Sequence, residues 1–169
     1  MWKAVQERGR YESKLPIAYA HDLKEAYEGV IRILGRFTPE RKAILDALRD
    51  ELRKHNYLPV LFDFEKPKSR NFTETMKTLA HLARFVIADL TDPASIPQEL
   101  QAIIPTLAVP VQPVLFEEKR EYAMFVDFLK TYPWVLPVHY YRDQASLLAS
   151  LKDRVIDPAE RKAQELEKR

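Results

Sequence analysis

Residues 83–100 read ARFVIADLTDPASIPQEL, and this stretch decides the fold. Its first part, residues 85–90, is almost entirely apolar, which is typical of a parallel strand buried on both faces. A short polar turn follows, and Ser95 and Gln98 are then spaced as in an N-terminal capping box. The stretch therefore predicts a central parallel strand, a turn and the start of a helix, with Glu99 in the first helical turn.

The same alternation of apolar run and helical period continues from residue 30 to the end of the predicted sheet. One helical segment begins with Thr38 as N-cap and Pro39 at the first helical position, and ends where Asn56 can take a left-handed conformation. Strands that alternate with helices imply right-handed crossovers and a parallel sheet covered on both faces. We therefore expect an α/β, flavodoxin-like fold with a five-stranded parallel sheet in the order 2-1-3-4-5. The predicted strands are residues 30–34, 58–64, 85–90, 111–116 and 134–141.

The two ends of the chain lie outside this pattern. Residues 1–28 are interpreted as an N-terminal arm or linker, and residues 29–156 as one domain, in keeping with the length of 169 residues. Residues 157–169 begin with Asp157 as a cap and Pro158, and continue as a charged helix with little to bury. We expect this last helix to be exposed.

Composition excludes several classes of function. The 27 Lys and Arg residues nearly balance the 25 Asp and Glu residues, so the net charge of +2 gives no reason to expect a nucleic acid or membrane partner. Without cysteine there is no disulfide, thiol nucleophile or thiolate metal site. Three glycines are too few for a glycine-rich dinucleotide turn or a P-loop. No apolar run approaches the roughly 20 residues of a membrane span, and we expect a soluble, cytoplasmic protein.

Strand order also predicts where a ligand would bind. In an open parallel sheet the site lies beyond the carboxyl ends of the strands where the order reverses, here between strands one and three. This places residues 35–38, GRFT, beside residues 91–99, TDPASIPQE. Glu99 would be a fixed carboxylate near the positive end of a helix, and Arg36 would bind a phosphate or pair with Glu99. On position alone the simpler role for Glu99 is helix stabilisation of about 0.3–1 kcal/mol.

Two aspartates at the end of the central strand are further candidates for acid–base or metal chemistry. Asp89 ends the apolar run, and Asp92 precedes a proline in the turn. Aspartate commonly accepts hydrogen bonds from turn amides, so both are interpreted as turn acceptors.

Several longer patterns occur in the order that is found in one known family. They are ILGRFTPERK from Ile33, HNYLPVLFD from His55, FVIADLTD from Phe85, QEL from Gln98 and VQPVLF from Val111. Together they make residues 33–155 resemble a Toll/interleukin-1 receptor (TIR) domain, of the bacterial-type branch that cleaves NAD. Glu99 matches the catalytic glutamate of that family, and residues 36–38 match the ligand-contacting loop after the first strand.

This resemblance implies a NAD glycohydrolase that cleaves the bond between nicotinamide and ribose, with NAD as substrate and no cofactor or metal. Glu99 would stabilise the positive charge that develops on the ribosyl group. Arg36 would bind the diphosphate, and Phe37 or Phe64 would stack on a ring. The implied partners are further copies of the chain or other TIR-type domains, in bacterial defence signalling. The implied substrate-binding residues are Arg36, Phe37, Thr38, Phe64 and Ser95, the last standing where active members often have tryptophan.

Two other interpretations remain open. Residues 85–100 also resemble a nucleoside 2-deoxyribosyltransferase, in which Glu99 would be a covalent nucleophile. In that family glycine usually follows the Glu-Leu pair, whereas this chain has Gln101. Alternatively, the chain is a non-enzymatic TIR interaction module that contacts partners through residues 64–71.

Overall fold

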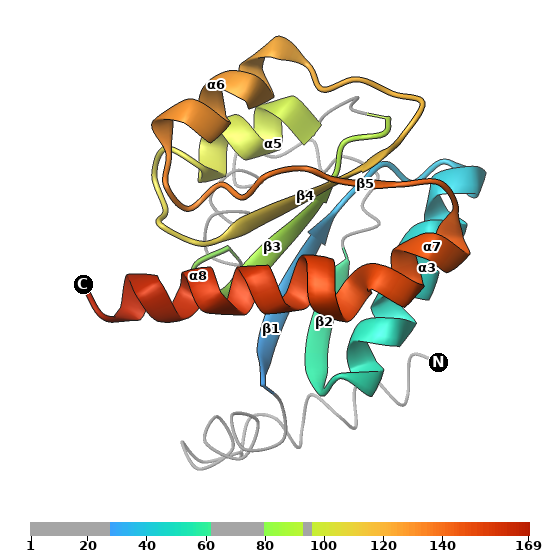
Figure 1. The fold of residues 1–169 in the computed structure, drawn as a ribbon, viewed down its shortest axis with the longest axis horizontal. Coiled ribbons are helices and arrows are strands. Elements are labelled where there is room, and N and C mark those ends of the chain that lie inside the picture. Colours follow the sequence, from blue (N-terminus) through green and yellow to red (C-terminus); the bar gives the residue numbers. More distant parts are fainter. Residues whose placement is uncertain (1–27, 62–79, 93–95) are drawn as a thin grey trace, which may run out of the picture.

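The computed structural model describes residues 28–61, 80–92 and 96–169. It contains a five-stranded parallel sheet with the order β2-β1-β3-β4-β5 (Figure 1), which confirms the predicted fold class and strand order. The strands are β1 (Gly29–Leu34), β2 (Tyr57–Leu61), β3 (Ala83–Asp89), β4 (Val111–Phe116) and β5 (His139–Tyr141). The helical segments are α3 (Pro39–Lys54), α5 (Ile96–Ile103), α6 (Ala123–Thr131), α7 (Gln144–Leu151), the π-helical η1 (Lys152–Ile156) and α8 (Asp157–Glu167).

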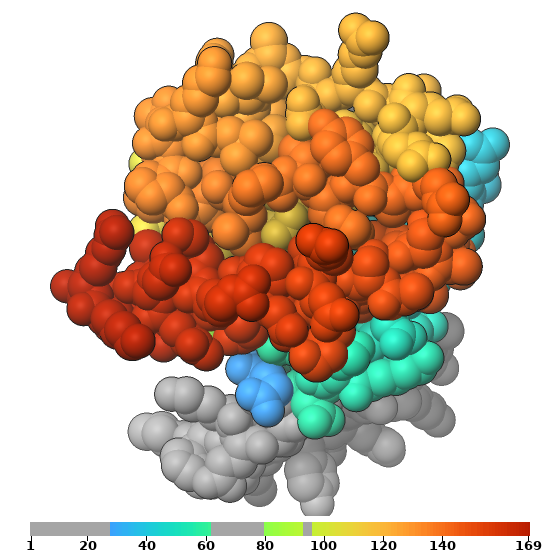
Figure 2. Space-filling view, in the orientation of Figure 1, coloured from blue at the N-terminus to red at the C-terminus, as the bar shows by residue number. Residues whose placement is uncertain are grey.

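Helices cover both faces of the sheet, and each face has its own apolar cluster. Because side chains alternate along a strand, Phe85 and Ile87 of β3 face α3, α7 and α8, whereas Val86 and Ala88 face α5 and α6. All four side chains are fully buried. Figure 2 shows α7 and α8 as a band across the middle of one face of the molecule, with the segment around α6 beside them. The apolar run from which we began is therefore the centre of the core, as predicted.

The limits of α3 follow from local sequence signals. The Thr38 hydroxyl accepts a hydrogen bond from the backbone N–H of Arg41 at 3.4 Å, and Pro39 occupies the first helical position. At the other end Asn56 has a φ of 63°. The predicted cap and the predicted left-handed residue are thus both confirmed.

The fifth strand is shorter than predicted. Within residues 134–141 only the last three residues form β5, and Val135 makes a single bridge to Val111. Pro137 lies between them and has no N–H to donate to a neighbouring strand. Its carbonyl instead accepts a hydrogen bond from the Gln112 side chain at 2.9 Å. Proline therefore interrupts the strand.

Helix α8 begins at residue 157, as predicted, but Asp157 does not cap it. The helical path continues from α7 through η1 into α8, so Asp157 lies inside a continuous helix and is not an N-cap. Figure 1 shows this continuous helical path, from α7 into α8, running across the sheet.

The prediction that this C-terminal helix would be exposed is also wrong. Ala159 and Ala163 of α8 are buried, because small side chains let the helix lie close to the sheet. Glu160 accepts hydrogen bonds from the Tyr57 hydroxyl at 2.9 Å and from Arg84 at 3.0 Å. Helix α8 thus packs as part of the same body as the strands.

Some predictions fall outside the described residues. These are the arm up to residue 27, the end of the second strand at residues 62–64, the loop 64–71 and most of the helix that follows it. Within the described ranges, no helix combines the length and apolar character that crossing a membrane requires.

Candidate active site

The loops after β1 and β3 meet at the carboxyl edge of the sheet, as the strand order predicted. Nη1 of Arg36 donates to both carboxylate oxygens of Asp92, at 2.7 and 2.8 Å. The Arg36 side chain is 48% exposed, so this ion pair contributes about 0–1 kcal/mol to stability. Its main effect is to hold the two loops together where the strand order reverses. Asp92 is thus the partner of Arg36, and the amides of residues 93–95, which would test its predicted role as a turn acceptor, lie outside the described residues.

Glu99 pairs with Arg32 and not with Arg36. Glu99 lies in the first turn of α5, and its Oε2 is 3.7 Å from Nη2 of Arg32. Arg32 is in the middle of β1, between Val60 of β2 and Val86 of β3. Its side chain is 1% exposed, and that of Glu99 is 16% exposed. The pair therefore joins the first strand to the helix that follows the third strand.

Burial alone disfavours the charge on Arg32. Desolvation lowers the pKa of Arg32 to about 10, although the nearby charge of Glu99 raises it. At neutral pH the guanidinium therefore stays protonated, and the Glu99 carboxylate faces a permanent positive charge. The sequence analysis missed Arg32, but a single charged residue inside the apolar run VIRIL was a usable signal.

The other predicted site residues have different outcomes. Phe37 is partly buried against the apolar cluster under α3, and Thr38 caps α3, so the structure gives both of them packing or capping roles. Phe64 and Ser95 lie outside the described residues. Of the predicted set, Arg36 and Glu99 lie on the loops or helix starts that meet at the switch point of the sheet.

A buried polar network, missed by the sequence analysis, lies at the same edge on the α3 side. Nε of Arg41 donates to Asp89 at 2.9 Å, and its Nη2 contacts both Asp89 and the Tyr141 hydroxyl. Asp89 also accepts from the N–H of Thr91 at 3.1 Å, which confirms its predicted role as a turn acceptor. Arg41 was detectable because a cation in the first turn of a helix opposes the dipole unless a carboxylate stabilises it.

The charges in this network stabilise one another. Burial lowers the pKa of Arg41, but the neighbouring Asp89 and Tyr141 raise it above the ordinary value overall. Burial and the charge of Asp89 raise the pKa of Tyr141. At neutral pH Arg41 is thus a cation and Tyr141 a neutral phenol, each with a fixed hydrogen-bonding role.

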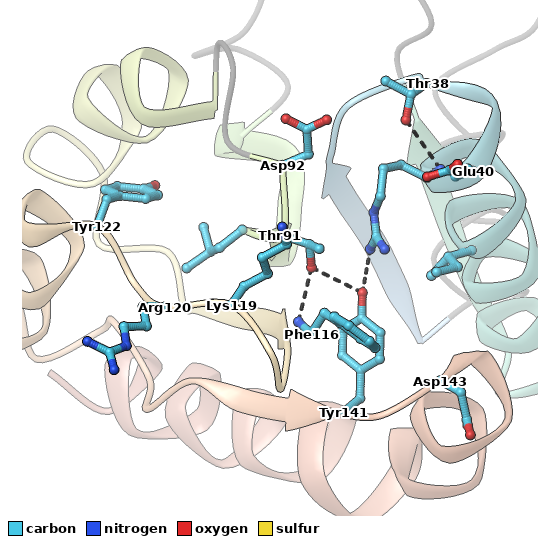
Figure 3. A pocket seen from close by; sticks show the side chains of 13 residues that line it. Thr38, Glu40, Thr91, Asp92, Phe116, Lys119, Arg120, Tyr122, Tyr141 and Asp143 are labelled. Atoms are coloured by element: carbon cyan, nitrogen blue, oxygen red, sulfur yellow. Dashed lines mark hydrogen bonds between the residues drawn. The ribbon is translucent and has the colours of Figure 1, made fainter.

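An open cleft of about 740 Å³ lies over this network (Figure 3), within the range of roughly 300–1,000 Å³ for small-molecule sites. Its walls come from the start of α3 and from the segments after β3, β4 and β5. Glu99 and Arg32, both of which the structure describes, do not line this cleft. The polar lining includes Arg41, Thr91, Asp92, Lys119, Tyr122 and Tyr141.

Comparisons with known proteins identify a similar structure. No family model matches the chain, and no curated protein matches its sequence. Among solved structures, a CMP N-glycosidase from Clostridium botulinum has a TM-score of 0.57 and 16% sequence identity to this chain. The match covers 73% of this chain and 98% of the glycosidase chain. At this level of identity, the similarity shows that the two proteins share an α/β fold.

Proposed function

We propose that this protein is an N-glycosidase that cleaves the bond between the base and the ribosyl group of a nucleotide, with Glu99 as the catalytic carboxylate. One observation carries the proposal. The Glu99 carboxylate is held 3.7 Å from a buried guanidinium, at the switch point where open parallel sheets bind ligands. The shared fold with a CMP N-glycosidase supports the reaction class.

In this mechanism the bond between the base nitrogen and C1′ breaks, and its electron pair leaves with the base. The ribosyl group develops an oxocarbenium-like positive charge, which the Glu99 carboxylate stabilises. Water then adds to C1′. Its proton passes to solvent when the base leaves as a neutral molecule, or to the base when the base leaves as an anion. Arg32 places a positive charge 3.7 Å from the carboxylate and so helps to orient it.

NAD is the first substrate to test, because the TIR resemblance implies it. Nicotinamide leaves as a neutral molecule, so this reaction needs no general acid. A nucleoside monophosphate such as CMP is the second, and the shared fold with a CMP N-glycosidase favours it. The released base separates the two substrates, since chromatography distinguishes nicotinamide from cytosine.

The decisive experiment compares wild-type protein with Glu99→Gln on both substrates, over a series of protein concentrations. The series is needed because the TIR resemblance implies that copies must assemble for activity. Loss of a stabilising charge at the reacting centre should lower the rate by about 10²–10³-fold. Gln98→Ala is the matched control, since Gln98 is exposed in the same helical turn.

Three results would count against the proposal. It is wrong if Glu99→Gln retains the wild-type rate, or if neither substrate is cleaved at any concentration. The third contrary result would come from incubation with a deoxynucleoside and a free base. Exchange of the bases would identify a transferase, with Glu99 as a covalent nucleophile.

A further inference from the structure

The hydroxyl groups of Thr91 and Tyr141 leave one hydrogen for a ligand. Their oxygens are 3.2 Å apart, and Thr91 also accepts the N–H of Phe116 at 3.1 Å. Arg41 donates to the Tyr141 oxygen. The two hydroxyl groups carry two hydrogens, and one of these is donated in the hydrogen bond between them. In the described ranges no acceptor takes the other, so the pair has one O–H to donate from the lining of the cleft.

A lysine adds positive charge to the same cleft. Lys119 and Arg120 both follow β4 and are exposed, and neither forms an ion pair with any described residue. Figure 3 shows the Lys119 side chain running toward the middle of the cleft, whereas the Arg120 guanidinium points away from it. The side chains of these two neighbouring cations thus point in different directions, so a variant at Arg120 is a matched control for a variant at Lys119.

Two other charges of the lining are neutralised by ion pairs, and the carboxylate of Asp143 is engaged as a helix cap. Arg41 is paired with Asp89, and Asp92 with Arg36. Asp143 accepts the N–H of Ser146 at 2.7 Å as the cap of α7. On the β4 side the cleft therefore presents an ammonium group together with a hydroxyl donor.

Glu40 is the remaining carboxylate of the lining and lies on α3, away from Lys119 in Figure 3. A ligand with an anionic group at one end and hydroxyl groups at the other would match this separation of charge. A phosphorylated sugar has that chemistry, because phosphate accepts charge-assisted hydrogen bonds and sugar hydroxyls donate to carboxylates.

We infer that this cleft binds the phosphate of the nucleotide substrate, with Nζ of Lys119 and the remaining O–H of the Thr91–Tyr141 pair as donors. The inference rests on the proposed function for the class of substrate. It replaces Arg36 as the expected phosphate ligand, because the guanidinium of Arg36 is already bonded to Asp92.

The test measures binding to Glu99→Gln protein by calorimetry, so that the ligands stay intact. CMP is compared with cytidine, and NAD with nicotinamide riboside. In whichever of these two pairs the protein binds, the phosphorylated compound should bind about tenfold more tightly, or better, than the compound without phosphate. The reason is that a charge-assisted hydrogen bond is stronger than a neutral one. Adding Lys119→Gln should bring this affinity ratio close to one, while adding Arg120→Gln should leave it unchanged.

Thr91 provides a second, independent variant. Thr91→Val removes the hydroxyl and should lower the affinity ratio, whereas Thr91→Ser keeps the hydroxyl and should preserve it. Melting temperatures of all variants establish that they are folded. The inference is overturned if no phosphorylated ligand binds more tightly than its partner, or if Lys119→Gln leaves the ratio intact.

Failure of this inference is distinguishable from failure of the proposed function. Phosphate-dependent binding without cleavage by the wild-type protein would retain the phosphate site and reject the glycosidase. Cleavage by the wild-type protein, with an affinity ratio that Lys119 does not affect, would retain the glycosidase and reject the phosphate site.

Discussion

The guanidinium of Arg32 in the middle of β1 lies 3.7 Å from the carboxylate of Glu99 in the first turn of α5. One member of this pair is fully buried and the other mostly buried, so each leaves a poorly solvated charge if its partner is removed. The pair has both a structural effect, since it ties a strand to a helix, and a chemical effect, since it fixes a carboxylate. These effects can be separated by mutation.

We expect Arg32→Met and Glu99→Gln each to lower the free energy of unfolding by about 1–3 kcal/mol, because each breaks an ion pair whose two side chains are only 1% and 16% exposed. The double variant should recover much of this loss, since no uncompensated charge remains, but it should stay inactive. Urea denaturation and the nicotinamide or cytosine assay measure the two properties. Additive destabilisation in the double variant would show that the two side chains are not energetically coupled.

Tyr122 gives a prediction about alkaline pH. Its hydroxyl is buried and makes no hydrogen bond to any described residue. Burial raises the pKa of Tyr122 to about 12 from an ordinary value of 10.0. Between these pH values the folded protein keeps a proton that the unfolded chain loses, so the free energy of unfolding should fall as pH rises through this window.

Tyr122→Phe should remove this contribution to the pH dependence. It should also raise the free energy of unfolding at pH 8 by about 0.5–1 kcal/mol, because a buried hydroxyl without a partner is eliminated. Urea titrations between about pH 8 and pH 11 provide the measurement. A variant with the same slope as wild type would contradict the assignment of this slope to Tyr122.

Gly35 is required by close packing of the loop that carries Arg36. A Cβ at this position would lie 2.7 and 2.8 Å from the two δ-carbons of Leu45 in α3. Gly35→Ala should therefore lower the free energy of unfolding by about 1–3 kcal/mol through overpacking. The same change in a Leu45→Ala background should cost much less. An equal cost in both backgrounds would mean that Leu45 is not the obstacle.

Glu160 tests whether α8 stabilises the sheet. This carboxylate bonds Tyr57 and Arg84, whereas Glu165 on the same helix pairs with its neighbour Lys162 and is 60% exposed. Glu160→Gln should lower the free energy of unfolding by about 1–2 kcal/mol, whereas Glu165→Gln should leave it nearly unchanged because that ion pair is exposed to solvent. Similar effects of the two substitutions in urea denaturation would mean that the contacts of α8 with the sheet contribute little.

The fold was predictable where neighbouring residues determine it. The apolar run around Val86 and the Thr38–Pro39 helix start are local signals, and both lie where they were expected. Strand order then brought Arg36 and Asp92 together, although 56 positions separate them. Helix α8 was misjudged because two alanines carry little hydrophobic signal, while their small size is what allows close packing.

The partners in the candidate site were harder to predict. The Arg41–Asp89–Tyr141 network joins residues that are 48 and 100 positions apart, on a helix and two strands. Which side chains meet depends on how α3 is placed over the sheet, and no short pattern contains that information. The partner of Glu99 depends in the same way on how α5 lies over β1.

The π-helical segment between α7 and α8 changes the direction in which the buried face of the helix points. A π turn contains one residue more than an α turn, and each residue turns an α-helix by about 100°. Shortening residues 152–156 by one position would straighten the path into a regular helix, but it would rotate Ala159 and Ala163 away from the sheet. The extra residue thus lets one continuous helix turn an apolar face toward the sheet in both of its halves. In α7 this face lies beside the cleft, and in α8 it lies toward the opposite edge of the strands.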